Sequence, residues 1–331
     1  MSNRKQLKIE YVKEKGGCCQ ICGYKESIKS LVFHHIGQKK FKISDLKSKT
    51  KSYQELVNTM LICQNCHQSL SIGIPSISYG QNLILGLSET CGWSQEFCHI
   101  VSFKKKHGLT GKKIKVAVMD TGILEHKELK IQEHINFTKG GPMDVHGTFV
   151  SGIIAAKVNN YGICGIAPNV ELYDVRVLDS NGLSDGYKNI HSALNWCYDN
   201  GMDLINCSFG SFMPPKDLEI WKKGIVVAAS GNCGKPEIDY PARIDEVVAV
   251  GSISKNGQQS AFSNYGLFLD LLAPGDEIVS CGKNDSIITS SGTSFAAPFV
   301  VGIFALLLEY GIKDKQELID KTKKIFEGGD I

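Results

Sequence analysis

The sequence predicts an α/β protein with a doubly wound parallel sheet and a small N-terminal module held by zinc. From residue 112 onward, apolar runs rich in β-branched residues alternate with helical stretches. Such runs lack strict polar alternation, which is typical of parallel strands covered on both faces. Near the N-terminus, two Cys-x-x-Cys pairs stand about forty residues apart. The N-terminal segment is also basic, whereas the rest of the chain is acidic, which indicates two unlike parts.

The expected elements follow one another regularly in the second part of the chain. A last helix is expected after Ser294, within the stretch Ser290–Val300, where Gly-Thr-Ser precedes a long apolar run. A serine at a helix N-terminus has free backbone N–H groups and the positive end of the helix dipole beside it. Serine and threonine are also favoured there simply as caps. The other strands are expected at residues 114–120, 171–178, 203–210, 224–230, 246–253 and 269–274, and the other helices at 146–158 and 187–201.

Composition and charge support two modules with different partners. The chain has 331 residues, of which 42% are hydrophobic and 21% charged, enough for one large domain and one small one. Residues 1–72 contain 13 Lys and Arg against 5 Asp and Glu, a net charge of +8, and the remainder contains 24 against 29, a net charge of −5. A basic module suggests an anionic partner such as nucleic acid.

The sequence also suggests a cytoplasmic protein. We find no apolar run of about 18 residues that would span a membrane, and residues 1–17 lack the apolar segment of a signal peptide. The cysteines outside the N-terminal module lie in apolar contexts, where a free thiol behaves as a small hydrophobe. We therefore expect few or no disulfides, and we expect Cys91 and Cys98 to be packing residues.

Four cysteines form the expected zinc site. The pairs Cys19/Cys22 and Cys63/Cys66 match the tetrahedral thiolate coordination of structural Zn²⁺. Between them an apolar, strand-like run, Leu31–Ile36, contains two adjacent histidines. The lysines at positions 39–42 and 47–51 favour contact with phosphates, although they could equally form a solvated face.

The order of Cys-x-x-Cys, Phe-His-His-Ile and Leu-Ile-Cys-Gln-Asn-Cys-His resembles the HNH endonuclease family with a zinc-ribbon brace, a ββα fold. The resemblance implies that His35 is a general base for phosphodiester cleavage. It further implies that His34 and His67 hold Mg²⁺ or another divalent ion that stabilises the leaving oxygen. A further histidine that such members often carry after the last cysteine is replaced here by Gln68–Ser71. The module could therefore bind nucleic acid, DNA rather than RNA, without cutting it.

The domain boundaries follow from composition. We expect the HNH-like zinc-binding domain at residues 1–70, a linker or arm with a lead-in helix at 71–108, and the larger domain at 109–331. Residues 71–90 are poor in charge and contain Pro75 and several glycines, which predicts an extended arm. We hypothesise that this arm restrains the active site.

Four polar residues stand where predicted strands end or helices begin. Asp120 closes a strand, Asn232 follows another, and His146 and Ser294 lie at the starts of helices. Ligands of open α/β sheets collect at these carboxyl ends. Carboxylate, imidazole and hydroxyl are the groups needed to orient a base, accept a proton and attack a carbonyl. Each residue alone could instead be a cap or a turn residue.

Four short motifs follow one another along the chain: Asp-Thr-Gly at 120–122, His-Gly-Thr-Phe-Val-Ser-Gly at 146–152, Ser-Gly-Asn at 230–232 and Gly-Thr-Ser-Phe-Ala-Ala-Pro at 292–298. Together they resemble the motifs of the subtilisin-like serine proteases. The chain order Asp, His, Ser is also the order found in that family. The resemblance implies that Ser294 is the nucleophile, His146 the base and Asp120 the group that holds the imidazole tautomer. It implies that Asn232 donates to the oxyanion, and that the segment Ser208, Phe209 and Gly210 pairs with the substrate as an extra strand.

Calcium is a further possibility, because residues 158–163 resemble the calcium loop of that family, with Glu128 and Asn160 as candidate ligands. The sequence thus predicts a cytosolic serine endopeptidase that acts on peptide substrates, controlled by nucleic acid through the HNH-like module, with a role in defence or stress. One alternative is a metal-dependent nuclease with an attached processing protease. The other is a nucleic-acid-binding module in which neither site turns over. The oligomeric state is not predicted.

Overall fold

The computed structural model describes residues 31–35, 59–63, 91–141 and 143–331. The first two segments are strands, β1 (Leu31–His35) and β2 (Thr59–Cys63), which form an antiparallel pair. In their register Leu31 lies opposite Cys63 and His35 opposite Thr59. The predicted strand that contains the two histidines is therefore present. Cys19, Cys22, Cys66, His67, the two lysine groups and residues 71–90 lie outside the described residues.

The larger part of the described chain contains a sheet of seven parallel strands. Their order is β4-β5-β3-β6-β7-β8-β9, so β3 lies near the middle and its carboxyl end faces the same edge as those of its neighbours. The strands are β3 (Lys115–Asp120), β4 (Ile131–Asn136), β5 (Glu171–Arg176), β6 (Leu204–Cys207), β7 (Ile225–Ala229), β8 (Val248–Ile253) and β9 (Leu271–Pro274).

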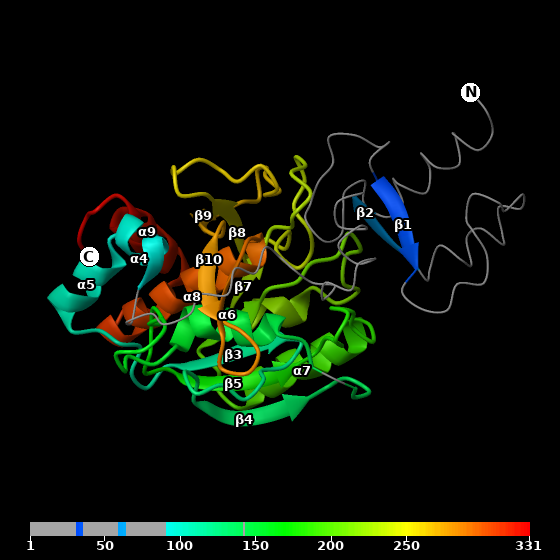
Figure 1. Ribbon diagram of the computed structural model, residues 1–331, viewed down its shortest axis with the longest axis horizontal. Helices are drawn as coiled ribbons and strands as arrows, with labels where there is room; N and C mark the ends of the chain where they lie inside the picture. Colours follow the sequence, from blue (N-terminus) through cyan, green and yellow to red (C-terminus); the bar gives the residue numbers. More distant parts are fainter. Residues whose placement is uncertain (1–30, 36–58, 64–90, 142) are drawn as a thin grey trace, which may run out of the picture. The chain divides into compact units, whose positions relative to one another are not determined.

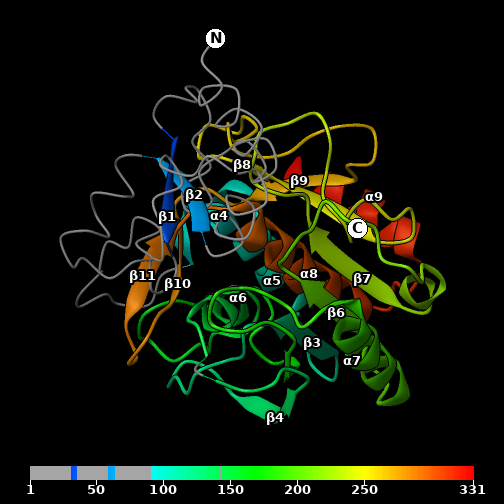
Figure 2. The same ribbon diagram turned by 90° about the vertical axis from the view of Figure 1, so that its right-hand side faces the viewer.

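Helices cover both faces of this sheet (Figures 1 and 2). On one face α6 and α8 pack against side chains such as Val116 and Val118, and on the other α7 packs against Ala117 and Met119. Successive residues of β3 therefore feed two separate cores, which explains why the strand is apolar throughout. The predicted doubly wound α/β fold is confirmed. The helices are α4 (Gly92–Phe97), α5 (Ile100–His107), α6 (His146–Ala155), α7 (Tyr187–Asp199), the 3-10 helix η3 (Glu219–Lys222), α8 (Thr293–Tyr310) and α9 (Lys315–Phe326).

Three strands were not expected from the sequence. Strand β4 is polar and largely exposed at the edge of the sheet, so it has no apolar run to reveal it. The other two, β10 (Ile278–Cys281) and β11 (Ile287–Ser290), form an antiparallel hairpin that leads directly into α8. This hairpin fixes where the helix that carries Ser294 begins.

One apolar helix corrects the expectation that no stretch is long enough to span a membrane. Helix α8 has 18 residues and a mean hydropathy of 1.7, and by length and composition it could cross a bilayer. It is 78% buried inside the fold, however, with α6 and the sheet strands around it. A helix that is apolar all round is expected in the centre of a large domain as well as in a membrane. Its burial therefore accounts for its composition.

A disulfide corrects a second expectation, that Cys91 is only a packing residue. Cys91 is bonded to Cys164, with 5.2 Å between their Cα atoms. The same two segments are also joined by a hydrogen bond of 2.7 Å from Gln95 Nε2 to the carbonyl oxygen of Cys164. Cys98, in contrast, is a buried free thiol, as expected, and burial raises its pKa to about 12. The disulfide thus fastens α4 to the loop after α6.

Replacing both Cys91 and Cys164 by alanine should lower the free energy of unfolding by about 4 kcal/mol, because the bond closes a loop with a sequence separation of 73 residues and so restricts the unfolded chain. Urea denaturation without reductant measures the difference. Cys98→Ala is the matched control, since it removes a buried thiol from the same region without opening a loop, and it should cost clearly less. Equal losses in the two proteins would show that the bond contributes nothing beyond packing.

Candidate active site

Asp120 is the last residue of β3 and its side chain is fully buried. Its Oδ1 accepts a hydrogen bond of 2.7 Å from the backbone N–H of Thr121 and lies 2.8 Å from Nδ1 of His146. A buried carboxylate is stable only when it is paired or hydrogen-bonded, and the imidazole is the ionisable partner seen here. The carboxylate is thus placed to hold one tautomer of the ring.

His146 is held at the first residue of α6. Its backbone N–H donates to Asp144 Oδ1 over 3.0 Å, and the next residue, Gly147, donates to Thr121 Oγ1 over 3.1 Å. A Cβ at Gly147 would lie 2.4 Å from the carbonyl oxygen of Gly122, so only glycine lets the helix approach the Asp120 strand this closely. The approach brings the two catalytic candidates into contact from segments 26 residues apart.

The protonation of His146 is set by opposing effects. Burial lowers its pKa, but the charge of Asp120 and the hydrogen bond to it raise the pKa more strongly, with a smaller contribution from Asp144. The net result is a pKa above the ordinary value of 6.5. Because Nδ1 donates to the carboxylate, Nε2 of the neutral ring is left as the proton acceptor.

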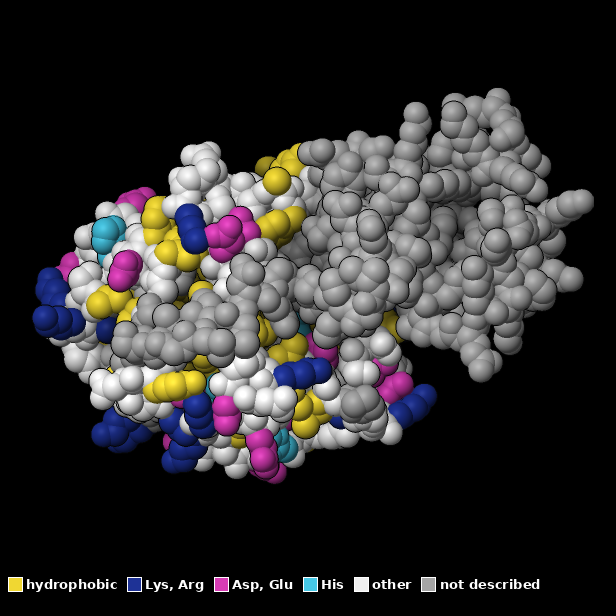
Figure 3. Space-filling model, in the orientation of Figure 1, with side chains coloured by type: hydrophobic (Ala, Val, Ile, Leu, Met, Phe, Trp, Pro, Cys, Tyr) yellow, Lys and Arg dark blue, Asp and Glu magenta, His cyan; other side chains and the backbone are white. Residues whose placement is uncertain are grey.

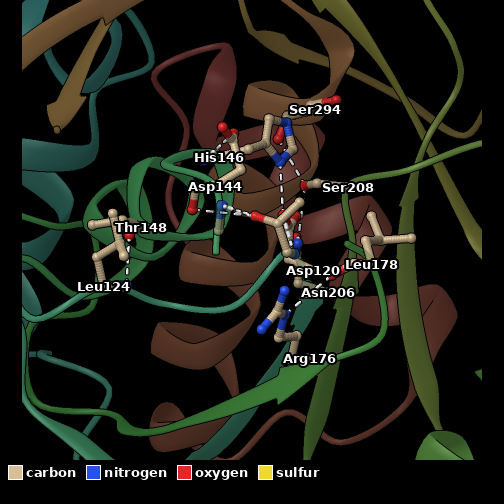
Figure 4. Close-up of polar contacts among 12 residues, drawn as sticks. Asp120, Leu124, Asp144, His146, Thr148, Arg176, Leu178, Asn206, Ser208 and Ser294 are labelled. Carbon is tan, nitrogen blue, oxygen red and sulfur yellow. Dashed lines mark hydrogen bonds and ion pairs between the residues drawn. The ribbon is translucent and has the colours of Figure 1, made fainter. Parts of the chain in front are cut away.

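Ser294 is the second residue of α8 and is partly exposed. Figure 4 shows the imidazole of His146 between Asp120 and Ser294. The backbone of Ser294 is fixed from the neighbouring strand: Ser208 Oγ donates to its carbonyl oxygen over 2.7 Å, and Asn206 Nδ2 donates to Ser208 Oγ over 2.9 Å. The ring of Phe295 packs against the imidazole with 5.6 Å between centroids. The serine is therefore held in place from both sides.

The loop that leads to Asn232 is tied to the same helix start. The backbone N–H of Gly231 donates to Thr293 Oγ1 over 3.2 Å, and Asn264 Nδ2 donates to the carbonyl oxygen of Ser230 over 3.1 Å. Gly231 has a φ of 102°, a conformation that favours glycine. Asn232 thus follows a rigid turn, and its role as oxyanion donor stays a prediction.

The predicted substrate segment directly follows β6. Ser208 is buried and is used to position Ser294, a structural task that the sequence did not reveal. Phe209 packs against the core on the α7 side of the sheet, while Gly210 lies beside Asp239. Pairing of this segment with a substrate strand stays a prediction.

Two further groups that support the site were missed at the sequence level. Thr148 Oγ1 accepts a hydrogen bond of 2.8 Å from the backbone N–H of Leu124 and so ties the loop after Asp120 to α6 (Figure 4). Asp174, in the neighbouring strand β5, is buried and lies 2.8 Å from Nδ1 of His134. Burial raises the pKa of Asp174, against the hydrogen bond from His134. No motif marks either residue, because their partners are distant in sequence.

The metal sites can be compared only where the chain is described. His34 and His35 are the last two residues of β1, and Cys63 is the last residue of β2. Within the described ranges no group of three or more His, Cys, Asp or Glu side chains could hold a metal ion. The zinc and divalent-ion sites therefore stay predictions.

The calcium site stays a prediction. Both carboxylate oxygens of Glu128 lie 3.2 Å from Nδ2 of Asn159, which donates to them. Glu128 is buried, so this amide provides hydrogen bonds that a buried carboxylate needs. Asn160, the second candidate, lies in the same loop and has a φ of 65°.

The geometry defines a class of enzyme site. A buried carboxylate orients an imidazole, and the imidazole lies beside a serine at the start of a helix, which is the arrangement used for nucleophilic attack on carbonyl groups.

Comparison with known proteins gives the same result. The sequence model of the Subtilase family matches residues 111–320, and the chain belongs to that family. The model of the HNH endonuclease family matches residues 19–71.

Several characterised proteins resemble the larger part of the chain. An alkaline protease of Alkalihalobacillus alcalophilus is 43% identical over 210 residues, which cover 60% of this chain and 55% of that protein. Subtilisin Savinase of Lederbergia lenta is 42% identical over 210 residues, 60% of this chain and 78% of that protein. The crystal structure of a cold adapted subtilisin-like serine proteinase superimposes with a TM-score of 0.59 at 28% identity, over 65% of this chain and 83% of that one. The chain therefore spans about half the length of the alkaline protease.

Proposed function

We propose that this protein is a serine endopeptidase that hydrolyses peptide bonds through Ser294, His146 and Asp120. The observation that carries the proposal is the contact of 2.8 Å between Asp120 Oδ1 and His146 Nδ1, next to a serine whose backbone is fixed by Ser208. A hydroxyl in this position needs a neutral imidazole as its base, and the buried carboxylate selects the tautomer that supplies one.

The reaction then follows from the positions of these groups. Ser294 Oγ attacks the peptide carbonyl carbon while His146 Nε2 takes the hydroxyl proton, and Asp120 stabilises the resulting imidazolium. The imidazolium returns the proton to the leaving amine, which gives an acyl-enzyme and frees one product. Water then enters, His146 takes one of its protons, and hydrolysis restores the serine. The backbone N–H of Ser294 and the side chain of Asn232 would stabilise the negative oxygen in both steps.

We further propose that nucleic acid controls this activity through the N-terminal module. The support is the match of residues 19–71 to the HNH endonuclease family and the charge of +8 on residues 1–72. On the face drawn in Figure 3, by comparison, basic and acidic side chains of the larger domain are interspersed. An interspersed face gives little net attraction for phosphates, and residues 73–331 carry a net charge of −5, so the N-terminal module is the better candidate for contact with DNA.

We also propose a cytosolic location and a role in defence or stress, with residues 71–90 as a restraint on the active site. The free, buried thiols of Cys98, Cys197, Cys207 and Cys281 suit a reducing compartment. The disulfide between Cys91 and Cys164 instead suits an oxidising compartment. Cell fractionation, with free thiols alkylated before lysis, decides between the two.

Proteolysis by the full chain should rise when double-stranded DNA is added, because the module that binds DNA shares the chain with the catalytic serine. The measurement is hydrolysis of a protein substrate with and without DNA or RNA, with Ser294→Ala as the blank. If proteolysis responded to neither DNA nor RNA, the proposed regulation by nucleic acid would be wrong.

A second candidate function is a metal-dependent nuclease with an attached processing protease, favoured by the same HNH match. DNA cleavage in Mg²⁺ or Mn²⁺ that disappears in His35→Ala and persists in Ser294→Ala would establish it. If neither site turned over while DNA still bound, the protein would be a binding module.

A further inference from the structure

One acidic side chain lies where the two segments beside the active site meet. A Cβ placed on Gly210 would lie 3.0 Å from Cβ of Asp239, and one placed on Gly231 would lie 2.3 Å from its Oδ2. Gly210 ends the predicted substrate segment, and Gly231 precedes the predicted oxyanion residue. Both segments are fastened to the start of α8, through Ser208 and Thr293 respectively. The carboxylate of Asp239 is therefore next to two backbones that a bound substrate would touch.

Asp239 is held rigidly in this position. Its side chain is only 11% exposed, and its backbone N–H donates to the carbonyl oxygen of Ser230 over 3.0 Å. The next residue, Tyr240, exchanges two backbone hydrogen bonds of 2.8 Å with Ser211, which directly follows Gly210. Asp239 is thus fastened to the loop before Asn232 by its own backbone, and to the chain that carries the substrate segment through Tyr240. A side chain fixed in this way is preorganised to recognise a ligand.

The two oxygens of the carboxylate have different surroundings. Nζ of Lys235 lies 2.9 Å from Oδ1, and the same ammonium lies 3.8 Å from the centroid of the Phe212 ring. Oδ2 is the oxygen that faces Gly231, and none of the residues that the structure describes donates a hydrogen bond to it. Burial raises the pKa of Asp239, while the hydrogen bond and charge of Lys235 act against that rise and favour the charged form.

We propose that Asp239 is a specificity-determining residue that binds a lysine or arginine side chain of the substrate, on the residue just before the scissile bond. This rests on the proposed endopeptidase function. A carboxylate accepts several hydrogen bonds, so Oδ2 can take a substrate cation while Lys235 remains on Oδ1. The Phe212 ring offers the Lys235 ammonium a second favourable contact, which eases the approach of another positive charge. An acidic substrate side chain would instead meet the negative oxygen first.

The test uses the full chain and a set of fluorogenic peptides that differ only in the residue before the scissile bond: arginine, lysine, leucine or glutamate. The value of kcat/KM for arginine and lysine should exceed that for leucine, and glutamate should be poorest. Asp239→Asn keeps the shape but removes the charge, so the ratio of arginine to leucine should fall about 10- to 100-fold. Labelling of Ser294 by a fluorophosphonate, compared between the variant and the unmodified chain, shows that the enzyme is intact.

Two further variants separate recognition from general charge effects. Glu237→Gln is the matched control, because it removes an exposed acid two residues away that is paired with Arg243, and it should leave the ratio unchanged. Lys235→Met should raise the ratio at a pH high enough to keep Asp239 charged, since it removes the competing cation. Inhibition of the unmodified chain by peptide aldehydes that end in arginine or in leucine needs no variant, and the arginine compound should bind more tightly.

Two results would overturn the proposal: the same ratio of arginine to leucine in Asp239→Asn as in the unmodified chain, or a preference for leucine or glutamate. A different failure concerns the proposed function. If no peptide were hydrolysed and a fluorophosphonate did not label Ser294, the endopeptidase function itself would be wrong, and the assigned specificity would be wrong with it.

Discussion

Replacing Ser294 by alanine should reduce kcat for peptide hydrolysis by about 10⁶-fold, the size known for the triad of subtilisin, the family to which this chain belongs. The physical reason is that the variant loses the nucleophilic hydroxyl, whereas the backbone of residue 294, held by Ser208, and the imidazole of His146 beside it stay in place. The residual rate should come from substrate binding and oxyanion stabilisation alone. The measurement is kcat for a peptide substrate at saturating concentration.

The variant Ser291→Ala is the matched control for this experiment. Ser291 lies three residues earlier in the same turn, and its Oγ accepts a hydrogen bond of 2.9 Å from the backbone N–H of Glu277. Its loss should weaken the turn but leave hydrolysis within about 10-fold of the unmodified chain, as expected for one hydrogen bond. His146→Ala should cost as much as Ser294→Ala, and the double variant little more, because the residues act as a unit. Additive losses would contradict a shared mechanism.

The parts of the site that sequence predicted are those whose chemistry demands a residue type at a fixed place in the fold. Asp120 and Ser294 stand at the carboxyl end of a strand and the start of a helix, and both positions can be inferred from local apolar patterns. The parallel sheet was predicted for the same reason, since strands buried on both faces must be apolar throughout. Strand β4 was not predicted, because an exposed edge strand does not need to be apolar throughout.

Pairings between distant segments could not be predicted in this way. The bond between Cys91 and Cys164 joins residues 73 positions apart, and the contact of His134 with Asp174 joins residues 40 positions apart. Neither pair has a characteristic spacing, so only the folded chain reveals them. The same holds for Ser208, whose sequence context indicated a substrate-binding strand, whereas its hydroxyl is used to fix the backbone of the nucleophile.

Asp239 was not predicted from the sequence for the same reason, because its contacts are with segments that are distant along the chain. In the sequence it is one acid among several in a short loop, and nothing local distinguishes it from Glu237. In the fold the first is buried beside Gly210 and Gly231, while the second is exposed and paired with Arg243. The two glycines leave the space that the carboxylate fills. Substrate specificity therefore depends on a contact between two loops, whereas the catalytic groups lie at the ends of single strands and helices.

Replacing Asp120 by asparagine should lower kcat by about 10⁴-fold, because an amide no longer holds the productive tautomer of His146 or stabilises its charged form. The pH dependence should change as well. In the unmodified chain the pKa of His146 is raised, so kcat/KM should fall as the pH drops through a value above 6.5. Removing the charge of Asp120 leaves burial, which lowers the pKa, as the main remaining effect, and the acid limb should move to lower pH.

The control for this shift is Asp144→Asn. Asp144 also raises the pKa of His146 by its charge, but it is the weakest of the contributions, and its Oδ1 contacts the backbone N–H and not the ring. The acid limb should therefore move in the same direction by a smaller amount, with kcat at high pH nearly retained. The measurement is kcat/KM against pH for the three proteins. An acid limb that stays in place in Asp120→Asn would mean that a group other than His146 limits activity at low pH. The carboxylate would then have to act on the rate through orientation of the ring alone.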